Sequence, residues 1–269
     1  MGDIRSRTRE IYALEQLAAG DTPIHRRHPA VKLIGCVAYL ICLMSLDSHS
    51  LGRMAPFLLY PLLILALGDI PMGLVFRRTL VVLPFCLLAG LSNLILERQP
   101  VLTLGHLTVT VGMAALLTIL LRAVLCVAAV LALIAVTPFP ALTGALRALH
   151  IPGSFVALLE MTYRYIGVLG EETASMTAAY QLRSGGKRAL EMRHMGSFVG
   201  NLLLRSFDRA QRVYGAMKLR GYGGAWHAGR RRGLNAGDWA YGLVTVGSSL
   251  LFRLIDFPGW IGGLVTCWM

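Results

Sequence analysis

Long apolar runs separated by basic, polar connections dominate this chain. A helix needs about 20 predominantly apolar residues to cross the hydrocarbon core of a bilayer. Five runs approach that length, although the first two are short: Val31–Leu46, Met54–Leu67, Thr79–Leu96, Leu107–Val136 and Trp239–Ile255. The pattern predicts an all-α polytopic membrane protein with about five transmembrane helices.

Between the fourth and fifth runs lies a polar stretch of about a hundred residues with helical periodicity. A short amphipathic helix over Ala141–Leu149 suits the membrane surface. In segment 154–183, apolar residues recur at the spacing of one helix face, and no proline interrupts them. Segment 197–220 repeats apolar and small residues at alternating four- and three-residue steps, which is typical of a seam against another helix. We expect two long rods here, the first about 45 Å in length.

The same pattern divides the chain into four parts. They are a cytoplasmic N-terminal arm (1–30), a four-helix transmembrane part (31–137), a cytoplasmic block that contains the two rods (138–236), and a fifth transmembrane helix with its tail (237–269). Residues 139–237 carry fourteen Lys and Arg against five acids, whereas the opposite loops hold only Arg53, Arg98 and Arg253. By the positive-inside rule, the N-terminus is cytoplasmic.

Composition narrows the classes of function. Hydrophobic residues make up 55% of the chain and charged residues 15%, whereas soluble domains carry nearer a quarter charged residues. The net charge of +12 is explained by the cytoplasmic connections, without nucleic acid. The five cysteines form no C-x-x-C pair, so neither a zinc site nor a disulfide framework is indicated. No catalytic motif and no phosphate-binding G-x-x-x-x-G-K-[ST] loop occurs.

Histidines and one arginine are the remaining candidates for polar chemistry. Among seven histidines, only His25 and His28 are close in sequence, and two arginines lie between them, which disfavours a dication site. We therefore expect no catalytic, cofactor-binding or metal-binding residue in this chain. Arg122 lies near the middle of the fourth run, where an ionisable side chain facing lipid is costly. We expect it to face the bundle interior, to pair, or to snorkel.

One short phrase ends both rods. Leu182-Arg183-Ser184 and Leu219-Arg220-Gly221 lie about 37 residues apart, and each is followed by further glycines. Two interpretations are open: the phrases are helix caps, in which glycine turns the chain and arginine complements the helix dipole, or the arginines dock in acidic grooves on a partner. The repetition favours docking. Three arginines on an adjoining stripe of the second rod are expected to stay free for water, lipid phosphate or a partner: Arg205, Arg209 and Arg212.

At these residues the chain resembles the transmembrane T component of energy-coupling-factor (ECF) transporters, specifically the CbiQ type used for cobalt import. That family carries two Ala-Arg-Gly signatures at the ends of two cytoplasmic coupling helices. Here both lack the leading alanine, and the first has serine for glycine. The phrase Thr22–Leu33 is similar to the family's Ser-Pro-Leu-His-Arg-Leu-Asp-Pro-Arg-x-Lys-Leu, with His28 for Asp and Ala30 for a basic residue. The resemblance runs from about Tyr12 to Ile255.

The resemblance implies a non-catalytic scaffold in the cell inner membrane. Two ABC ATPase subunits of the CbiO type would bind ATP beneath the coupling helices. An S component of the CbiM type, with a small CbiN-type membrane protein, would capture Co²⁺, so that no cofactor belongs to this chain itself. The expected ATPase-docking residues are Arg183, Ser184, Arg220 and Gly221, and the expected coupling-helix interface residues, which would pack on the S component or on each other, are Leu158, Leu203 and Met217.

Alternatives concern the cargo and the class of transporter. Nickel or a vitamin is an alternative to cobalt, because T components contact the S component and not the cargo. A conventional ABC importer permease is less favoured, because it has one coupling helix per subunit and builds the translocation path itself. A membrane-embedded enzyme would need intramembrane His, Asp or Glu, which the apolar runs almost lack.

Overall fold

The computed structural model describes residues 18, 20–46, 51–96, 100–104, 107–185, 191–223 and 233–254. Contacts within the chain divide it into two units. The bundle unit comprises Leu17–Leu142 and Arg232–Met269, and the hairpin unit comprises Met1–Gln16 and Thr143–Arg231.

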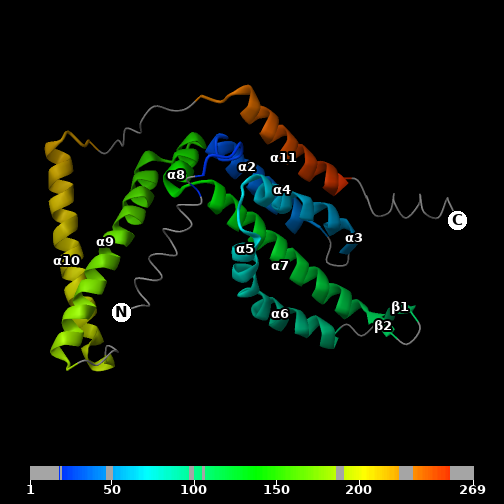
Figure 1. Ribbon diagram of the computed structural model, residues 1–269, viewed down its shortest axis with the longest axis horizontal. Coiled ribbons are helices and arrows are strands. Elements are labelled where there is room, and N and C mark those ends of the chain that lie inside the picture. Colours follow the sequence, from blue (N-terminus) through cyan, green and yellow to red (C-terminus); the bar gives the residue numbers. More distant parts are fainter. Residues whose placement is uncertain are drawn as a thin grey trace. The chain divides into compact units, whose positions relative to one another are not determined.

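Helices supply most of the described secondary structure (Figure 1). The bundle unit contains α2 (Pro29–Met44), α3 (Leu51–Met54), the 3₁₀ helix η1 (Ala55–Leu58), α4 (Leu59–Leu67), α5 (Met72–Leu80), α6 (Leu83–Leu96), β1 (Pro100–Leu104), β2 (Leu107–Thr110), α7 (Val111–Val136) and α11 (Ala236–Leu254). Helix α8 (Phe139–Ala148) continues the chain into the hairpin unit, which contains α9 (Gly153–Arg183) and α10 (Met192–Leu219).

Local sequence accounts for several helix ends. His28 caps α2, because its Nδ1 accepts the Ala30 N–H at 3.3 Å. Pro29 follows at the first helical position, where a missing N–H costs nothing. Pro138 closely follows the end of α7, and Pro84 lies in the first turn of α6, just after the break from α5. Proline lacks the N–H that would continue the preceding helix.

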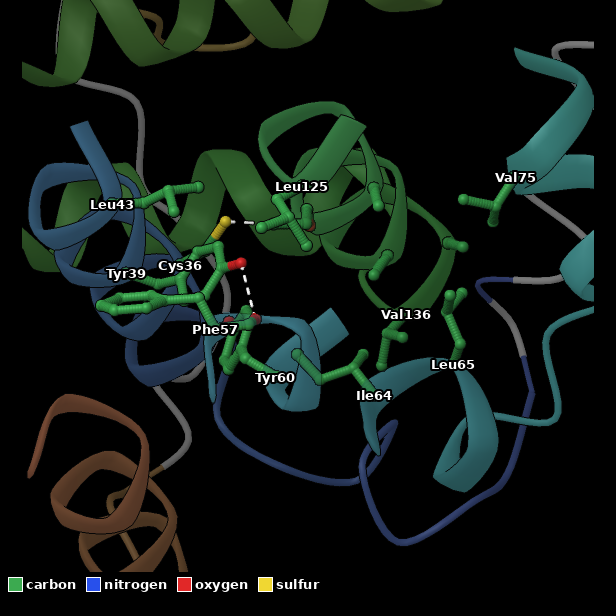
Figure 2. Packing of buried hydrophobic residues seen from close by; sticks show 14 of the residues in the cluster. Cys36, Tyr39, Leu43, Phe57, Tyr60, Ile64, Leu65, Val75, Leu125 and Val136 are labelled. Carbon is green, nitrogen blue, oxygen red and sulfur yellow. Dashed lines mark hydrogen bonds between the residues drawn. The ribbon is translucent and has the colours of Figure 1, made fainter. Parts of the chain in front are cut away.

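An aromatic cluster packed against small residues forms the centre of the bundle unit (Figure 2). Tyr39 of α2 stacks on Tyr60 of α4 with ring centroids 4.4 Å apart, and its hydroxyl donates to the Phe57 carbonyl at 2.9 Å. Small side chains let helices approach closely where van der Waals packing drives association. Helix α7 contributes a stripe of alanines to this core, none more than 9% exposed: Ala128, Ala129, Ala132 and Ala135.

Glycines bring α2 and α11 close together. A Cβ atom on Gly35 would lie 2.8 Å from Oγ1 of Thr245, and one on Gly242 would lie 2.8 Å from Cγ1 of Val31. Both separations are shorter than van der Waals contact, so a larger residue would push the helices apart. The pairing of the first and last helices of this unit therefore depends on glycine at both positions.

The predicted helices occur, with two corrections. Residues Leu107–Thr110, expected to begin the fourth span, form strand β2, which pairs antiparallel with β1. Threonine and valine alternate there, and this favours a strand over a helix. The third apolar run is also interrupted: α5 and α6 meet at a bend of 45°. The chain is thus helical apart from one two-stranded hairpin within the described ranges.

Length and composition identify few complete membrane spans in the described part of the chain. Gly112–Val136 qualifies alone, with a mean hydropathy of 2.9, and the bent pair α5–α6 adds a second if it is one span. Pro29–Met44 and Gly52–Leu67 are shorter apolar helices. The five predicted spans and the four predicted parts of the chain therefore stay predictions.

Candidate functional site: two arginine-ended helices

The long helices α9 and α10 carry both arginine phrases. They run in opposite directions (Figure 1). Glu172 of α9 joins them, because its carboxylate accepts from Arg205 at 2.5 Å and from Arg209 at 3.5 Å. The expectation that Arg205 and Arg209 stay free is therefore wrong. The antiparallel register places an acid opposite them, and sequence alone does not reveal that register.

Helix α9 ends at Arg183. Ser184 is the C-cap and donates its backbone N–H to the Tyr180 carbonyl at 2.9 Å. Gly185 follows with a φ of 66°. This left-handed conformation costs a non-glycine residue roughly 1 kcal/mol or more, so glycine is the residue that ends the helix here.

Helix α10 ends one residue earlier relative to its arginine. Arg220 is itself the C-cap, and Gly221 follows with a φ of 83°. The Gly221 N–H donates to the Lys218 carbonyl and the Tyr222 N–H to the Met217 carbonyl, both at 3.0 Å. These two bonds form a Schellman motif, which satisfies carbonyls that a helix end would otherwise leave open.

The two phrases therefore differ in register. Gly185, and not Ser184, is the structural counterpart of Gly221, because each is the left-handed residue. Capping explains both glycines. It does not explain the side chains of Arg183 and Arg220, which are exposed and have no hydrogen bond or ion pair with any residue that the structure describes.

Each arginine has an exposed leucine before it. Leu182 is 87% exposed and Leu219 is 92% exposed. Both helices thus end in an apolar side chain next to a cation, and both groups are accessible to a partner. Sequence reasoning singled out the arginines and missed the leucines, although leucine occurs in both copies of the phrase.

Arg183 also lines a pocket of about 280 Å³ between the end of α9 and the start of α10. The other lining residues are Tyr180 and Ser184 at the end of α9, and Glu191 and His194 at the start of α10. The rings of Tyr180 and His194 lie 5.8 Å apart, and the Glu191 N–H donates to the Tyr180 hydroxyl at 3.5 Å. Sequence analysis did not identify Tyr180, Glu191 and His194, because they come together only where the end of α9 meets the start of α10.

The three expected interface residues differ in how far they are exposed. Leu158, near the start of α9, is 62% exposed, and Leu203, at the middle of α10, is 67% exposed. Met217 is half-buried, and no residue of α10 is fully buried. The apolar face of α10 is therefore open to a partner. Its exposed members share one side of the helix: Met192, Val199, Leu203, Phe207 and Tyr214.

In the bundle unit, two arginines meet the end of α2. Nη2 of Arg122 donates to the Leu46 carbonyl at 2.6 Å, and Nη1 of Arg253 donates to the Ser45 carbonyl at 2.7 Å. Both carbonyls lie at the negative end of the helix dipole, which favours a cation. Arg122 thus pairs with the backbone inside its own unit.

A buried carboxylate ties the start of α11 to the start of α2. Asp238 is 2% exposed and accepts the backbone N–H groups of His28 and Asn235, both at 3.0 Å. Burial alone would raise the pKa of the Asp238 carboxyl, but the two hydrogen bonds together with the nearby charges of His28 and Arg27 lower the pKa below its ordinary value. Asp238 precedes the apolar run of α11, and sequence analysis missed it.

Lys32 binds the C-terminal end of α7. It is 3% exposed, and Nζ donates to the Val136 carbonyl at 3.0 Å and to the His25 carbonyl at 3.3 Å. The buried ammonium therefore joins α2 to the last residue of α7. Across the ranges that the structure describes, no group of three or more His, Cys, Asp or Glu side chains could hold a metal ion.

Comparisons with known proteins agree on one family. A family model described as cobalt transport protein, CbiQ, matches residues 20–231. The nickel permease LarQ of Lactiplantibacillus plantarum is 35% identical over 97 residues, which cover 35% of this chain and 36% of that protein. The cobalt transport protein CbiQ of Rhodobacter capsulatus is 33% identical over 89 residues, 33% of this chain and 36% of that protein.

A third relative extends further at lower identity. An uncharacterized protein of Methanocaldococcus jannaschii is 24% identical over 238 residues, which cover 84% of this chain and 80% of that protein. The matches to the first two relatives span about a third of the length of each. The family match includes both arginine phrases and the helices that carry them. The chain belongs to the CbiQ cobalt transport protein family, whose members are non-catalytic membrane components of transporters.

Proposed function

We propose that the chain is the transmembrane T component of an ECF-type ABC importer and couples movement of two ATPase subunits to an S component that captures the cargo. One observation carries the proposal. Both long helices end in an exposed leucine–arginine pair, and neither arginine has a partner among the residues described. A cation held at a rigid helix end suits an acidic groove on another protein.

The separation of the two arginines supports a pair of docking sites. Arg183 shares its pocket with the start of α10, whereas Arg220 lies at the other end of that helix. Helix α10 has 28 residues and is therefore about 42 Å long. Each arginine would bind a different ATPase subunit. A change in the distance between the subunits would then tilt the helix pair, which the ion pairs of Glu172 hold together.

The apolar surfaces support the remaining contacts. The open face of α10 and Leu158 of α9 would pack against the S component. Five spans, formed by α2, by α3–η1–α4, by α5–α6, by α7 and by α11, would hold the chain in the cell inner membrane. The basic connections place the N-terminus and the hairpin unit in the cytoplasm.

A detergent pull-down from native membranes tests the proposal. The tagged wild-type chain should retain an ABC ATPase and a small membrane protein. The variant Arg183→Glu/Arg220→Glu should lose the ATPase and keep the membrane protein, because reversal of one partner of a desolvated charge pair costs about 2–5 kcal/mol or more.

A matched control keeps the charge change and moves it away from the helix ends. Arg164→Glu/Arg212→Glu reverses one exposed arginine on each of α9 and α10, and this variant should retain the ATPase. If both double variants behave alike, or if no ATPase accompanies the wild type, the arginines serve only the helix ends and the proposal fails.

Cobalt is the proposed cargo and nickel is the second candidate. The matched relatives include one named for cobalt transport and one named for nickel, at similar identity. Metal analysis of the membrane protein that the wild-type chain retains separates the two. Bound Co²⁺ supports the first assignment, and bound Ni²⁺ replaces it with the second.

A further inference from the structure

The link between α8 and α9 lies far along the chain from both arginine phrases. The boundary between the two units falls within α8, because Leu142 belongs to the bundle unit and Thr143 to the hairpin unit. Among the described elements, α8 is the one that crosses this boundary. A movement that passes along the described backbone from the hairpin unit to the bundle unit therefore passes through α8.

A strained residue ends α8. The His150 N–H donates to the Arg147 carbonyl at 3.1 Å. The Ile151 N–H donates to the Leu146 carbonyl at 3.3 Å, which completes a Schellman motif. The left-handed residue of this motif is His150, with a φ of 64°, whereas α9 and α10 are followed by glycine at the corresponding position. A side chain makes this conformation costly, so it persists only where other contacts hold it in place.

Glu160 of α9 holds α8 from the other side of the link. Its Oε1 accepts the Thr143 hydroxyl at 3.0 Å and lies 3.8 Å from Nη2 of Arg147. The Arg147 side chain is 13% exposed, and its Nε and Nη2 have no hydrogen-bond partner among the described residues. A buried cation is costly without an opposite charge nearby, and Glu160 is that charge. Because Thr143 and Arg147 lie one turn apart, one carboxylate holds one face of α8.

The position of Glu160 along α9 gives this contact a mechanical role. Glu160 lies near the start of the helix, and Arg183 is its last residue. The helix between them is about 35 Å long. A force applied at Arg183 therefore acts on the link to α8 through a long arm. The force turns α8 only if the angle between the two helices is fixed.

We propose that Glu160 is a positioning residue that locks α8 to α9, so that the two helices turn as one lever when an ATPase subunit moves the end of α9. The inference deepens the proposed function and rests on it. Docking at Arg183 and transmission at Glu160 are then separate steps. Loss of the lock leaves ATPase binding intact, but the link bends and α8 no longer follows α9.

Distances between two spin labels test the lock on the full-length chain in detergent. Labels on genetically encoded amino acids replace Ala148 at the end of α8 and Ser175 on α9, both exposed, so that the native cysteines stay in place. The wild type should give one narrow distance peak. Glu160→Met keeps the length of the side chain but removes its charge and acceptor, and should broaden the peak. Glu171→Met, exposed on the same helix, is the matched control and should keep the peak narrow.

A double-mutant comparison assigns the broadening to the ion pair. Arg147→Met should broaden the peak as much as Glu160→Met does. The double variant should broaden it no further, because the effects of two partners in one contact do not add. Glu160→Gln keeps an acceptor for the Thr143 hydroxyl and should give an intermediate width. A peak as narrow in Glu160→Met as in the wild type overturns the lock.

The lever is tested in the complex with the ABC ATPase that accompanies the wild type. When ATP is added, the wild-type peak should stay in place, whereas the Glu160→Met peak should shift. Glu160→Met should bind the ATPase with an unchanged dissociation constant and still hydrolyse ATP. In proteoliposomes its uptake of Co²⁺, or of Ni²⁺ if the retained membrane protein binds nickel, should fall about tenfold, as is typical when two sites lose their coupling.

The remaining outcomes separate the inference from the proposed function. A wild-type peak that shifts with ATP overturns the rigid lever, and so does unchanged uptake by Glu160→Met. In both cases the ATPase still binds, and the proposed function stands. If no ABC ATPase accompanies the wild type, the proposed function fails and the lever with it. The peak widths of the chain alone then still decide whether Glu160 holds the two helices together.

Discussion

Cationic side chains have different bonding partners in the bundle unit and in the hairpin unit. In the bundle unit, three cations bind carbonyl groups of the same chain: Lys32, Arg122 and Arg253. In the hairpin unit, Arg183 and Arg220 are exposed and contact no polar group of the described residues. The bundle unit binds these three cations internally, whereas the hairpin unit leaves two arginines for further chains to contact. Substitutions in the first should therefore reduce stability, and substitutions in the second should reduce association.

The core of the bundle unit and the face of α10 differ in how far their apolar side chains are covered. Tyr39 and Phe57 are almost fully covered in the core of the bundle unit. Leu203 and Phe207 of α10 are more than half exposed. Exposed apolar surface on this scale marks a contact site for a protein or a membrane.

The largest effect is expected at Lys32. Lys32→Ala removes the donor from two carbonyls, one of them at the buried end of α7, and should lower the free energy of unfolding by about 2–5 kcal/mol. The apparent melting temperature in detergent measures it. Lys218→Ala, on the exposed end of α10, is the control and should melt like the wild type. Equal melting of both variants would contradict the internal role of Lys32.

A smaller loss of stability is expected from Gly35→Val. Its side chain would collide with Thr245 across the α2–α11 contact and should cost about 2 kcal/mol. A Cβ atom on Gly247, on α11, would meet no atom within 4 Å, so Gly247→Val serves as the control in the same melting assay. Unchanged melting of Gly35→Val would show that the two helices do not approach as closely as described.

Asp238→Asn should cost about 1 kcal/mol near neutral pH, because a neutral amide is a weaker acceptor for the two backbone N–H groups than a carboxylate. The folded-state pKa of Asp238 lies below its unfolded value of about 3.9, so its contribution to stability is complete above that pH. The contribution disappears as the pH falls through the folded-state pKa. The difference in melting temperature between wild type and Asp238→Asn should therefore shrink below about pH 4. A constant difference down to pH 3 would contradict this origin.

The smallest effect is expected between the two long helices. Glu172→Gln removes partly exposed ion pairs to Arg205 and Arg209 and should cost at most about 1 kcal/mol. The loss should be greatest at low salt, because screening already weakens the pairs at high salt. Melting at low and high ionic strength checks this. A loss of stability larger than that of Gly35→Val would contradict the interpretation of the Glu172 ion pairs as weak surface contacts.

Periodicity predicted the long helices well, because the position of a helix depends mainly on the spacing of apolar residues within its own segment. The first rod was expected over 154–183 and is observed as Gly153–Arg183. The repeated phrase likewise identified both arginines. The strand Leu107–Thr110 was missed because its apolar residues continue directly into those of α7, so that the run reads as one helix.

Contacts between distant residues could not be predicted in the same way. Asp238 binds His28 across most of the chain, and Glu172 meets Arg205 only because two helices fold back at a particular register. His194 approaches Arg183 for the same reason. Sequence shows which residues are polar, but their partners depend on tertiary arrangement.

As the first of the five proposed spans, α2 has a length that would affect the surrounding lipid. Its 16 residues cover about 24 Å, less than the roughly 30 Å of an average hydrocarbon layer. Because Arg122 and Arg253 fix the end of α2, the helix does not lengthen to remove this mismatch. In the proposed five-span topology, the bilayer would adapt instead, by becoming thinner next to the protein. A membrane made of shorter acyl chains should therefore accommodate this protein with less deformation than a thick one.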